Sequence, residues 1–280
     1  LEVVSAFPVD FYWTDLYVVD AQHVERIRSD SETGTRAFVE EVRRSPEVAV
    51  VPGAADVAVD VEVVPGIPAE HLVERARSAQ LLVVGSRGRG SVRSTLLGSV
   101  ALHCVARAEC PVVVVPTGGG GRGRRVVVGL DPSPASRVAL LRGAEEARLR
   151  GGALEVVVAV VPLDAWNDVS AWSGPSMPEL LGSAQRWAEA TVQDALADAG
   201  DLDIRVEAEV GPADTVLVRR AGGAALLVLG KRSRSRVVGM LLGSVALRSV
   251  VHAACPVMVV RPPSSTADAE TVPAAAAVSA

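Results

Sequence analysis

The sequence predicts an α/β protein built from two doubly wound domains, each with a mostly parallel sheet between helices. Short apolar runs alternate with longer segments of helical periodicity along the 280 residues, as expected for buried strands joined by crossover helices. The pattern also occurs twice, because residues 81–88 and 98–102 recur as 226–233 and 243–247. A period of about 145 residues is too long for a solenoid repeat and indicates a duplicated domain.

The second copy contains a complete set of predicted elements. In chain order they are a strand at 125–130, a helix at 135–150, a strand at 154–161, a helix at 178–198, a strand at 204–210, a helix at 212–221, a strand at 225–229, a helix at 243–252 and a strand at 256–260. Most of these strands are continuous apolar runs, which indicates burial on both faces. The strand at 204–210 alternates apolar and polar residues, so we place it at an edge of the sheet.

The first copy aligns with the second from its second strand onward. Its opening residues 1–4 (LEVV) match 154–157 (LEVV), and nothing in it corresponds to 125–152. We therefore predict a first domain at 1–117 without its first strand and helix, and a second domain at 125–263. The Gly/Arg-rich segment 118–124 reads as a flexible linker, and the Ala/Ser/Thr/Pro-rich residues 264–280 as a disordered tail.

Composition excludes several classes of protein. A net charge of −5 gives no reason to expect a nucleic-acid partner. No apolar run approaches the ~20 residues of a membrane span, and the first residues lack the pattern of a signal peptide, so we expect a cytoplasmic protein without a membrane partner. The three cysteines show neither disulfide nor metal spacing and are expected to be small buried residues.

Two glycine patterns have the form of a phosphate-binding loop. Gly118, Gly120 and Gly123 formally satisfy G-x-G-x-x-G, but a strand follows where a dinucleotide fold requires a helix, so this match is accidental. The pattern G-x-x-G-(x)9-G-S at 85–99 instead follows an apolar strand and ends at a helix start. Glycines allow close approach of the backbone to a polyphosphate, and the helix N-terminus favours an anion. Cationic side chains crowd both copies of this loop, either to attract phosphate or as a solvated charge run: Arg87, Arg89, Arg93, Lys231, Arg232, Arg234 and Arg236.

These motifs resemble those of the universal stress protein family, and the resemblance covers residues 1–263. It rests on the glycine motif with its Ser-Val, on the segment 64–68, and on the Cys-Pro-Val close of each copy. The resemblance implies an adenine-nucleotide α-hydrolase-like fold with sheet order 3-2-1-4-5 and ATP or another adenine nucleotide, with or without Mg²⁺, at the carboxyl ends of the strands. In that family an Asp after the first strand contacts adenine, and the glycine elements take ribose and phosphates. The nucleotide-binding residues it implies are Ala6, Val84, Gly85, Ser86, Arg87, Gly88, Gly98, Ser99 and Val100 in the first copy, and Asp131, Ala159, Gly230, Lys231, Arg232, Ser233, Gly243, Ser244 and Val245 in the second.

Neither copy matches the family pattern completely. The second copy has Asp131, but Ser233 replaces the second glycine of the motif, where a side chain would crowd the phosphate or, at positive φ, strain the loop. The first copy has every glycine but no Asp. Since strand 1 is central in a 3-2-1-4-5 sheet, its absence should leave strands 2 and 4 of the first copy without their shared partner. We expect the plainest cause to be truncation at the amino end, ahead of an eroded domain or one completed by another chain.

The function predicted from these features is nucleotide-dependent regulation in the stress response. No P-loop and no acid pair for Mg²⁺ beside a catalytic base is evident, so we expect no catalytic residues and at most incidental ATP hydrolysis. The alternative is a nucleotide-independent interaction scaffold with degenerate sites. In either case the last strands, from Pro111 to Val115 and from Pro256 to Val260, are uniformly apolar edges. We expect them to pair with each other in an intramolecular pseudo-dimer, or with a second chain in a homo-oligomer.

Overall fold

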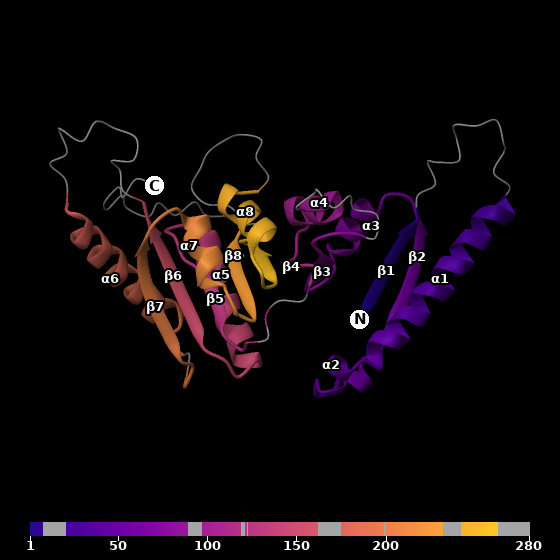
Figure 1. Ribbon diagram of the computed structural model, residues 1–280, viewed down its shortest axis with the longest axis horizontal. Coiled ribbons are helices and arrows are strands. Elements are labelled where there is room, and N and C mark those ends of the chain that lie inside the picture. Colours follow the sequence, from indigo (N-terminus) through magenta and orange to yellow (C-terminus); the bar gives the residue numbers. More distant parts are fainter. Residues whose placement is uncertain are drawn as a thin grey trace. The chain divides into compact units, whose positions relative to one another are not determined.

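The computed structural model describes residues 1–7, 21–88, 97–118, 121, 123–161, 175–198, 200–231 and 242–262, apart from the side chains of Ala21 and His23. These residues belong to two compact units, Leu1–Arg77 and Ser78–Ala280, whose elements are labelled in Figure 1. Within the described residues, no helix is long and apolar enough to cross a membrane.

The first unit is a two-stranded parallel sheet with helices against it. Its elements are β1 (Glu2–Phe7), α1 (Ala21–Arg43), α2 (Pro46–Ala49), the 3-10 turn η2 (Ala54–Asp56), β2 (Asp60–Pro65) and α3 (Pro68–Arg75). Glu2 pairs with Asp60, and the register continues to Phe7 and Pro65. Phe7, Val61 and Val63 form a small buried core, which α1 covers with apolar side chains. A sheet of two strands has little surface to bury, which explains why this core is small.

The second unit is a seven-stranded sheet in the order β3-β4-β9-β8-β5-β6-β7. Its elements are β3 (Leu82–Gly85), α4 (Ser99–Arg107), β4 (Val112–Val115), β5 (Val126–Gly129), α5 (Pro134–Leu149), β6 (Leu154–Val160), α6 (Met177–Ala195), β7 (Ile204–Val210), α7 (Ala213–Arg220), β8 (Leu226–Gly230), α8 (Ser244–His252) and β9 (Val257–Val260). The strands of the second copy follow the order β7-β6-β5-β8-β9, which is the predicted 3-2-1-4-5. The alternating strand β7 lies at an edge, as its pattern predicted.

Both faces of this sheet are buried because its central strands are apolar throughout. Val126 and Val128 pack in one core cluster with residues of α5 and α6. Val127, the residue between them, is also fully buried, and successive strand residues point to opposite faces. Gly143 allows α5 to lie close to the sheet, since a Cβ there would overlap the side chain of Val128. The capping box of Ser176 and Glu179 fixes the start of α6, and its hydrogen bonds lower the pKa of Glu179.

The two copies meet in this sheet through their last strands. β4 and β9 are antiparallel neighbours, with Val112 opposite Val259 and Val114 opposite Val257. At the centre of the pairing, Val113 lies opposite its own counterpart, Met258. A local pseudo-twofold axis therefore passes through this central pair and relates the two strands. The predicted pairing of the final strands occurs here within one chain.

The compact units do not follow the boundary between the copies. β1 and β2 of the first copy lie in the first unit, whereas β3 and β4 lie in the second. Within the described residues, β1 pairs with β2 alone and β3 with β4 alone. This is the consequence expected of a copy without a counterpart of β5, since in the second copy that strand joins β6 to β8. The domain limits 1–117 and 125–263 remain a prediction.

Candidate functional site

The predicted site of the second copy lies at the carboxyl ends of three neighbouring strands. β5 pairs in parallel with β6 on one side and with β8 on the other. Asp131 follows β5 by two residues, Ala159 is the penultimate residue of β6, and Gly230 ends β8. Because parallel strands end at the same edge of a sheet, these residues share one edge, where ligands of open α/β sheets bind.

The loop after β5 is held by the side chain of Asp131. Its Oδ1 accepts hydrogen bonds from the backbone N–H of Ser133, at 3.0 Å, and from the Ser133 hydroxyl. Ser133 in turn caps α5 by accepting from the N–H of Ser136 at 3.2 Å. Both bonds to Asp131 use Oδ1, so Oδ2 keeps its capacity to accept from a ligand. The carboxylate is half-buried beside the start of α5.

Gly230 brings the ends of β5 and β8 together. A Cβ at Gly230 would lie 2.8 Å from the backbone carbon of Ala135 in the first turn of α5, closer than real Cβ atoms come to backbone. The glycine is therefore required by packing between two parts of the protein, whatever it does for a ligand. At the equivalent Gly85 a Cβ would meet only the carbonyl of Arg87, at 3.2 Å, because the first copy has no counterpart of α5.

Both glycine motifs end at helix N-termini that carry no side-chain cap. Gly98 precedes α4 and Gly243 precedes α8, each in extended conformation and without a capping side chain. The first helical residues, Ser99 and Ser244, are exposed, and the following Val100 and Val245 are half-buried. The first N–H groups of a helix lack intrahelical partners and carry partial positive charge. Each start is thus suited to an anion.

Gly88 has no close neighbour among the described residues, which leave out 89–96. No described atom would come within 4 Å of a Cβ there, and the residue does not adopt positive φ. The expected strain of a side chain at this position therefore does not apply to the first copy, and crowding of a ligand is the remaining reason for a glycine. The corresponding Ser233 and its neighbour Arg232 lie outside the described residues.

The side chain of Lys231 contacts the first copy. Its ammonium group donates to the backbone carbonyl of Ala106, near the carboxyl end of α4 in the first copy. The side chain is 6% exposed, and burial, with a smaller contribution from Arg261, lowers its pKa to about 8. In this structure the Lys231 ammonium is engaged by backbone of the first copy, and its predicted role toward a phosphate stays a prediction. Sequence reasoning could not identify this contact because its partner lies 125 residues away.

The remaining predicted residues are placed as follows. Val84 is buried in β3, Ser86 is buried directly after that strand, and Arg87 is exposed. Ala6 belongs to the first unit, where it pairs with Val64.

Burial raises the pKa of the Cys104 thiol to about 11. Within the described residues no cluster of three or more His, Cys, Asp or Glu side chains could hold a metal ion.

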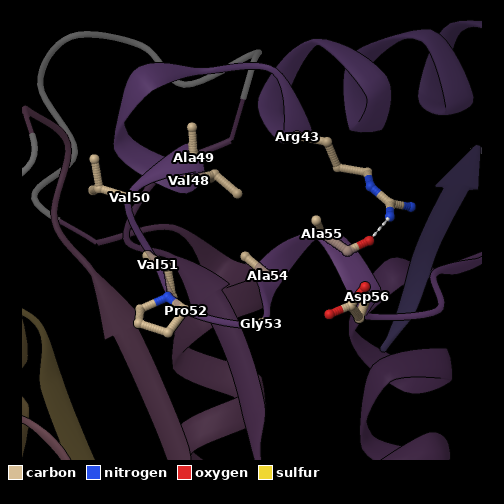
Figure 2. Close-up of a pocket in the computed structure, with 10 residues that line it drawn as sticks. All are labelled: Arg43, Val48, Ala49, Val50, Val51, Pro52, Gly53, Ala54, Ala55 and Asp56. Atoms are coloured by element: carbon tan, nitrogen blue, oxygen red, sulfur yellow. Dashed lines mark hydrogen bonds between the residues drawn. The ribbon is translucent and has the colours of Figure 1, made fainter.

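One hollow lies in the first unit and another adjoins the first glycine loop. One in the first unit, drawn in Figure 2, has a volume of about 440 Å³ and is lined by Arg43 and residues 48–56. Its Arg43 guanidinium donates to the carbonyl of Ala55 at 2.8 Å, and no predicted site residue lines it. The second hollow, of about 380 Å³, adjoins the first glycine loop at Ser86 and Arg87 and is also lined by residues 116–118 and by Val250, Val251, Ala253 and Ala254.

Comparisons with known proteins agree on one family. The model of the universal stress protein family matches residues 13–116 and 123–261. A universal stress protein of Mycobacterium tuberculosis is 35% identical over 210 residues, which are 71% of this chain and 68% of that protein. One of Mycolicibacterium smegmatis is 36% identical over 203 residues, 69% and 66% of the two chains. The solved structure of a universal stress protein from Archaeoglobus fulgidus covers 93% of this chain and 87% of its own, with a TM-score of 0.62 and 19% identity, and so shares the fold.

Proposed function

Because this chain belongs to the universal stress protein family, we propose that it is an adenine-nucleotide-binding regulatory module of the stress response. ATP is the proposed ligand, and the output is a conformation or a partner interaction set by nucleotide occupancy. The observation that carries this proposal is the pair of exposed, uncapped helix N-termini at Ser99 and Ser244, each directly preceded by the last glycine of the repeated motif.

The two copies would contribute differently to binding. In the second copy, the free Oδ2 of Asp131 can accept from the exocyclic amine of adenine, while the start of α8 faces the phosphates. In the first copy, Gly88 has no side chain to crowd a phosphate chain, which favours its close approach. With Lys231 engaged by Ala106, we propose that the first glycine loop is the stronger phosphate site. A Mg²⁺ ion would bind with the nucleotide through phosphate oxygens and water.

We propose a binding role without catalysis. The residues that the structure describes show two uncapped helix N-termini but no cluster of acidic or imidazole ligands for a metal. Such a site can hold a triphosphate, whereas rapid phosphoryl transfer also needs a positioned metal and a group that orients the nucleophile.

The proposal is tested by analysing nucleotide in protein purified without added ligand. Mass spectrometry of the denatured protein should release ATP or another adenine nucleotide, and calorimetry of the stripped protein should show rebinding. Protein that releases no nucleotide and binds none at millimolar ATP would contradict the proposal.

Ser99→Ala should then weaken ATP binding by about 10- to 100-fold, since loss of one hydrogen bond to a charged group costs ~1.5 to 3 kcal/mol. Ser244→Ala is the matched control in the second copy, and we expect it to weaken binding less. Calorimetry together with a circular dichroism spectrum would separate loss of binding from unfolding. The assignment fails if folded Ser99→Ala protein binds ATP as tightly as the wild type.

A second candidate function is a nucleotide-independent interaction scaffold. The antiparallel pairing of β4 with β9 favours it, because this pairing joins the copies through backbone hydrogen bonds of the two strands alone. Under this proposal the sheet presents a surface to partners while its glycine loops are degenerate. The nucleotide analysis above distinguishes the two candidates, since a scaffold would be isolated and would function without nucleotide.

A further inference from the structure

Ser86 and Lys231 occupy equivalent backbone positions in the two copies. The N–H of Ser86 donates to Val115 at 2.8 Å, as that of Lys231 donates to Val260 at 2.7 Å. Their carbonyls accept from Gly98 and Gly243, at 2.8 and 3.1 Å. The backbone is therefore the same in both copies, and the difference between the two positions lies in the side chain.

The second copy places an ammonium group at a helix carboxyl end. The Nζ of Lys231 donates to the carbonyl of Ala106, in the last turn of α4. Carbonyls in the last turn of a helix lack intrahelical partners and carry partial negative charge. Lys231 is buried in this position, and its hydrogen bond joins the two copies.

The first copy leaves the equivalent place open. About the axis through Val113 and Met258, the counterpart of Ala106 is Val251, in the last turn of α8. Ser86 is too short to reach that turn, and the hollow of about 380 Å³ has both Ser86 and Val251 in its lining. At this position the first copy has a serine, Ser86, where the second copy has a lysine, Lys231.

The lining of the hollow offers the groups that an ammonium cation requires. Its floor includes the buried hydroxyl of Ser86, which lies 3.4 Å from the Thr117 hydroxyl, and the last-turn carbonyls of α8 add further acceptors. Apolar side chains of Val250, Val251 and Ala253 line the rest, which suits a short alkyl chain. Arg87 stands at the rim and is exposed. Its charge does not exclude a cation here, because Lys231 is held in the equivalent place beside Arg261.

From this equivalence we propose that the hollow between Ser86 and the carboxyl end of α8 binds a primary alkylammonium group, such as the end of a small amine or a polyamine. The cation takes the position that the Lys231 side chain occupies in the other copy and donates to the Val251 carbonyl and the Ser86 hydroxyl. This site lies at the contact of the two copies and would join them by a second bridge.

The test uses the full chain without nucleotide and titrates n-propylammonium chloride while backbone amide resonances are recorded. We expect saturable shifts at Ser86, Thr117 and residues 250–254, with a Kd of about 1 to 10 mM. Two matched ligands serve as controls: n-propanol has the same chain without charge, and tetramethylammonium has charge without an N–H donor. Neither should produce these shifts.

Two variants decide whether the equivalence is correct. Ser86→Lys should fill the hollow from within and weaken n-propylammonium binding at least about tenfold. Lys231→Ala should create a second site, seen as new saturable shifts at residues 106–108. If Ser86→Lys does not fold, Ser86→Met fills the hollow with an uncharged chain and should also abolish binding.

Three results would overturn the proposal. They are the absence of saturable shifts at Ser86 and residues 250–254 in the wild type, undiminished binding by the folded variant at position 86, and binding by Lys231→Ala protein alone. The last result would mean that a last-turn carbonyl accepts an amine only where a lysine had been removed.

Discussion

At the scale of single residues, equivalent positions of the two copies have acquired different chemistry. Gly85 and Gly230 are equivalent residues of the motif, but only at Gly230 would a Cβ overlap the backbone of Ala135. Ser86 and Lys231 share their backbone hydrogen bonds, but only Lys231 reaches the opposite copy. A motif residue can therefore be retained for packing in one copy and remain available to a ligand in the other.

The buried ammonium of Lys231 predicts a pH dependence of stability. Its pKa falls from the ordinary 10.5 to about 8 on folding. Between these values the unfolded chain binds a proton that the native protein does not, so the free energy of unfolding should rise as pH increases from 8 to 10.5. Lys231→Met has no titrating group at this position and therefore lacks this contribution to the pH dependence of stability. Relative to Lys231→Met, the wild type should gain up to about 3 kcal/mol over this range, at 1.36 kcal/mol per pKa unit.

Urea unfolding of both proteins at pH 7.5 and pH 10 would measure this difference. Comparison of the two proteins is needed because burial also raises the pKa of Cys104, to about 11. That shift gives stability that is lost as pH rises above 9, but it is common to wild type and variant and cancels. Parallel pH profiles for the two proteins would contradict the prediction, because they would mean that folding does not lower the pKa of Lys231.

At the scale of secondary-structure elements, each copy has an arginine that ties two strands to the helix that follows. In the first copy, Arg75 of α3 pairs with Glu2 of β1 and Glu62 of β2. In the second copy, Arg220 of α7 pairs with Glu155 of β6 at 3.2 Å and with Glu209 of β7 at 2.7 Å. There, Arg125 before β5 adds a further ion pair to Glu155. The same arrangement is consequently more buried where β5 is present, with side-chain exposure of 10% at Glu155 and 41% at Glu2.

This difference predicts unequal effects of one substitution made in both copies. Glu155→Gln should lower the stability of β6 and β7 by about 2 kcal/mol, because it leaves two arginines without their buried carboxylate. Glu2→Gln, its matched control, should change β1 and β2 by less than about 1 kcal/mol, as expected for an exposed pair. Amide hydrogen exchange reports the strands separately. Equal losses of protection in the two copies would contradict the role given to Arg125 and burial.

At the scale of the whole molecule, the second unit is one sheet made from both copies. β4 pairs with β3 of its own copy on one side and with β9 of the second copy on the other. The two apolar final strands are therefore hydrogen-bonded to each other. Val113 and Met258 are buried at the centre of this junction. Two exposed apolar edges, which would otherwise favour aggregation, are thereby removed.

Substitution at the centre of the junction should detach β3 and β4 from the sheet. Val113→Pro removes a backbone donor from a strand that pairs on both sides, at a cost of ~3 kcal/mol, so amide protection in β3 and β4 should fall about 100-fold. Protection in β6 and β7 should stay unchanged, because those strands lie beyond β8 and β5. Val113→Ala keeps the donor and is the control. Retained protection of β3 in the proline variant would show that the strand is held by other contacts.

The sequence by itself determined the elements of the second copy, their order and the edge position of β7, because hydrophobic periodicity and turn residues act over a few neighbouring residues. It also determined the place of Asp131 and the pairing of the two final strands, since both follow from strand order and an apolar pattern. Only the tertiary structure decided that Gly230 is confined by Ala135, that Lys231 binds the carbonyl of Ala106, and that the first copy is divided between two units. Each of these depends on atoms that are remote in the chain, and whether a buried polar side chain turns toward a ligand or toward backbone is decided by the partner that packing brings within reach.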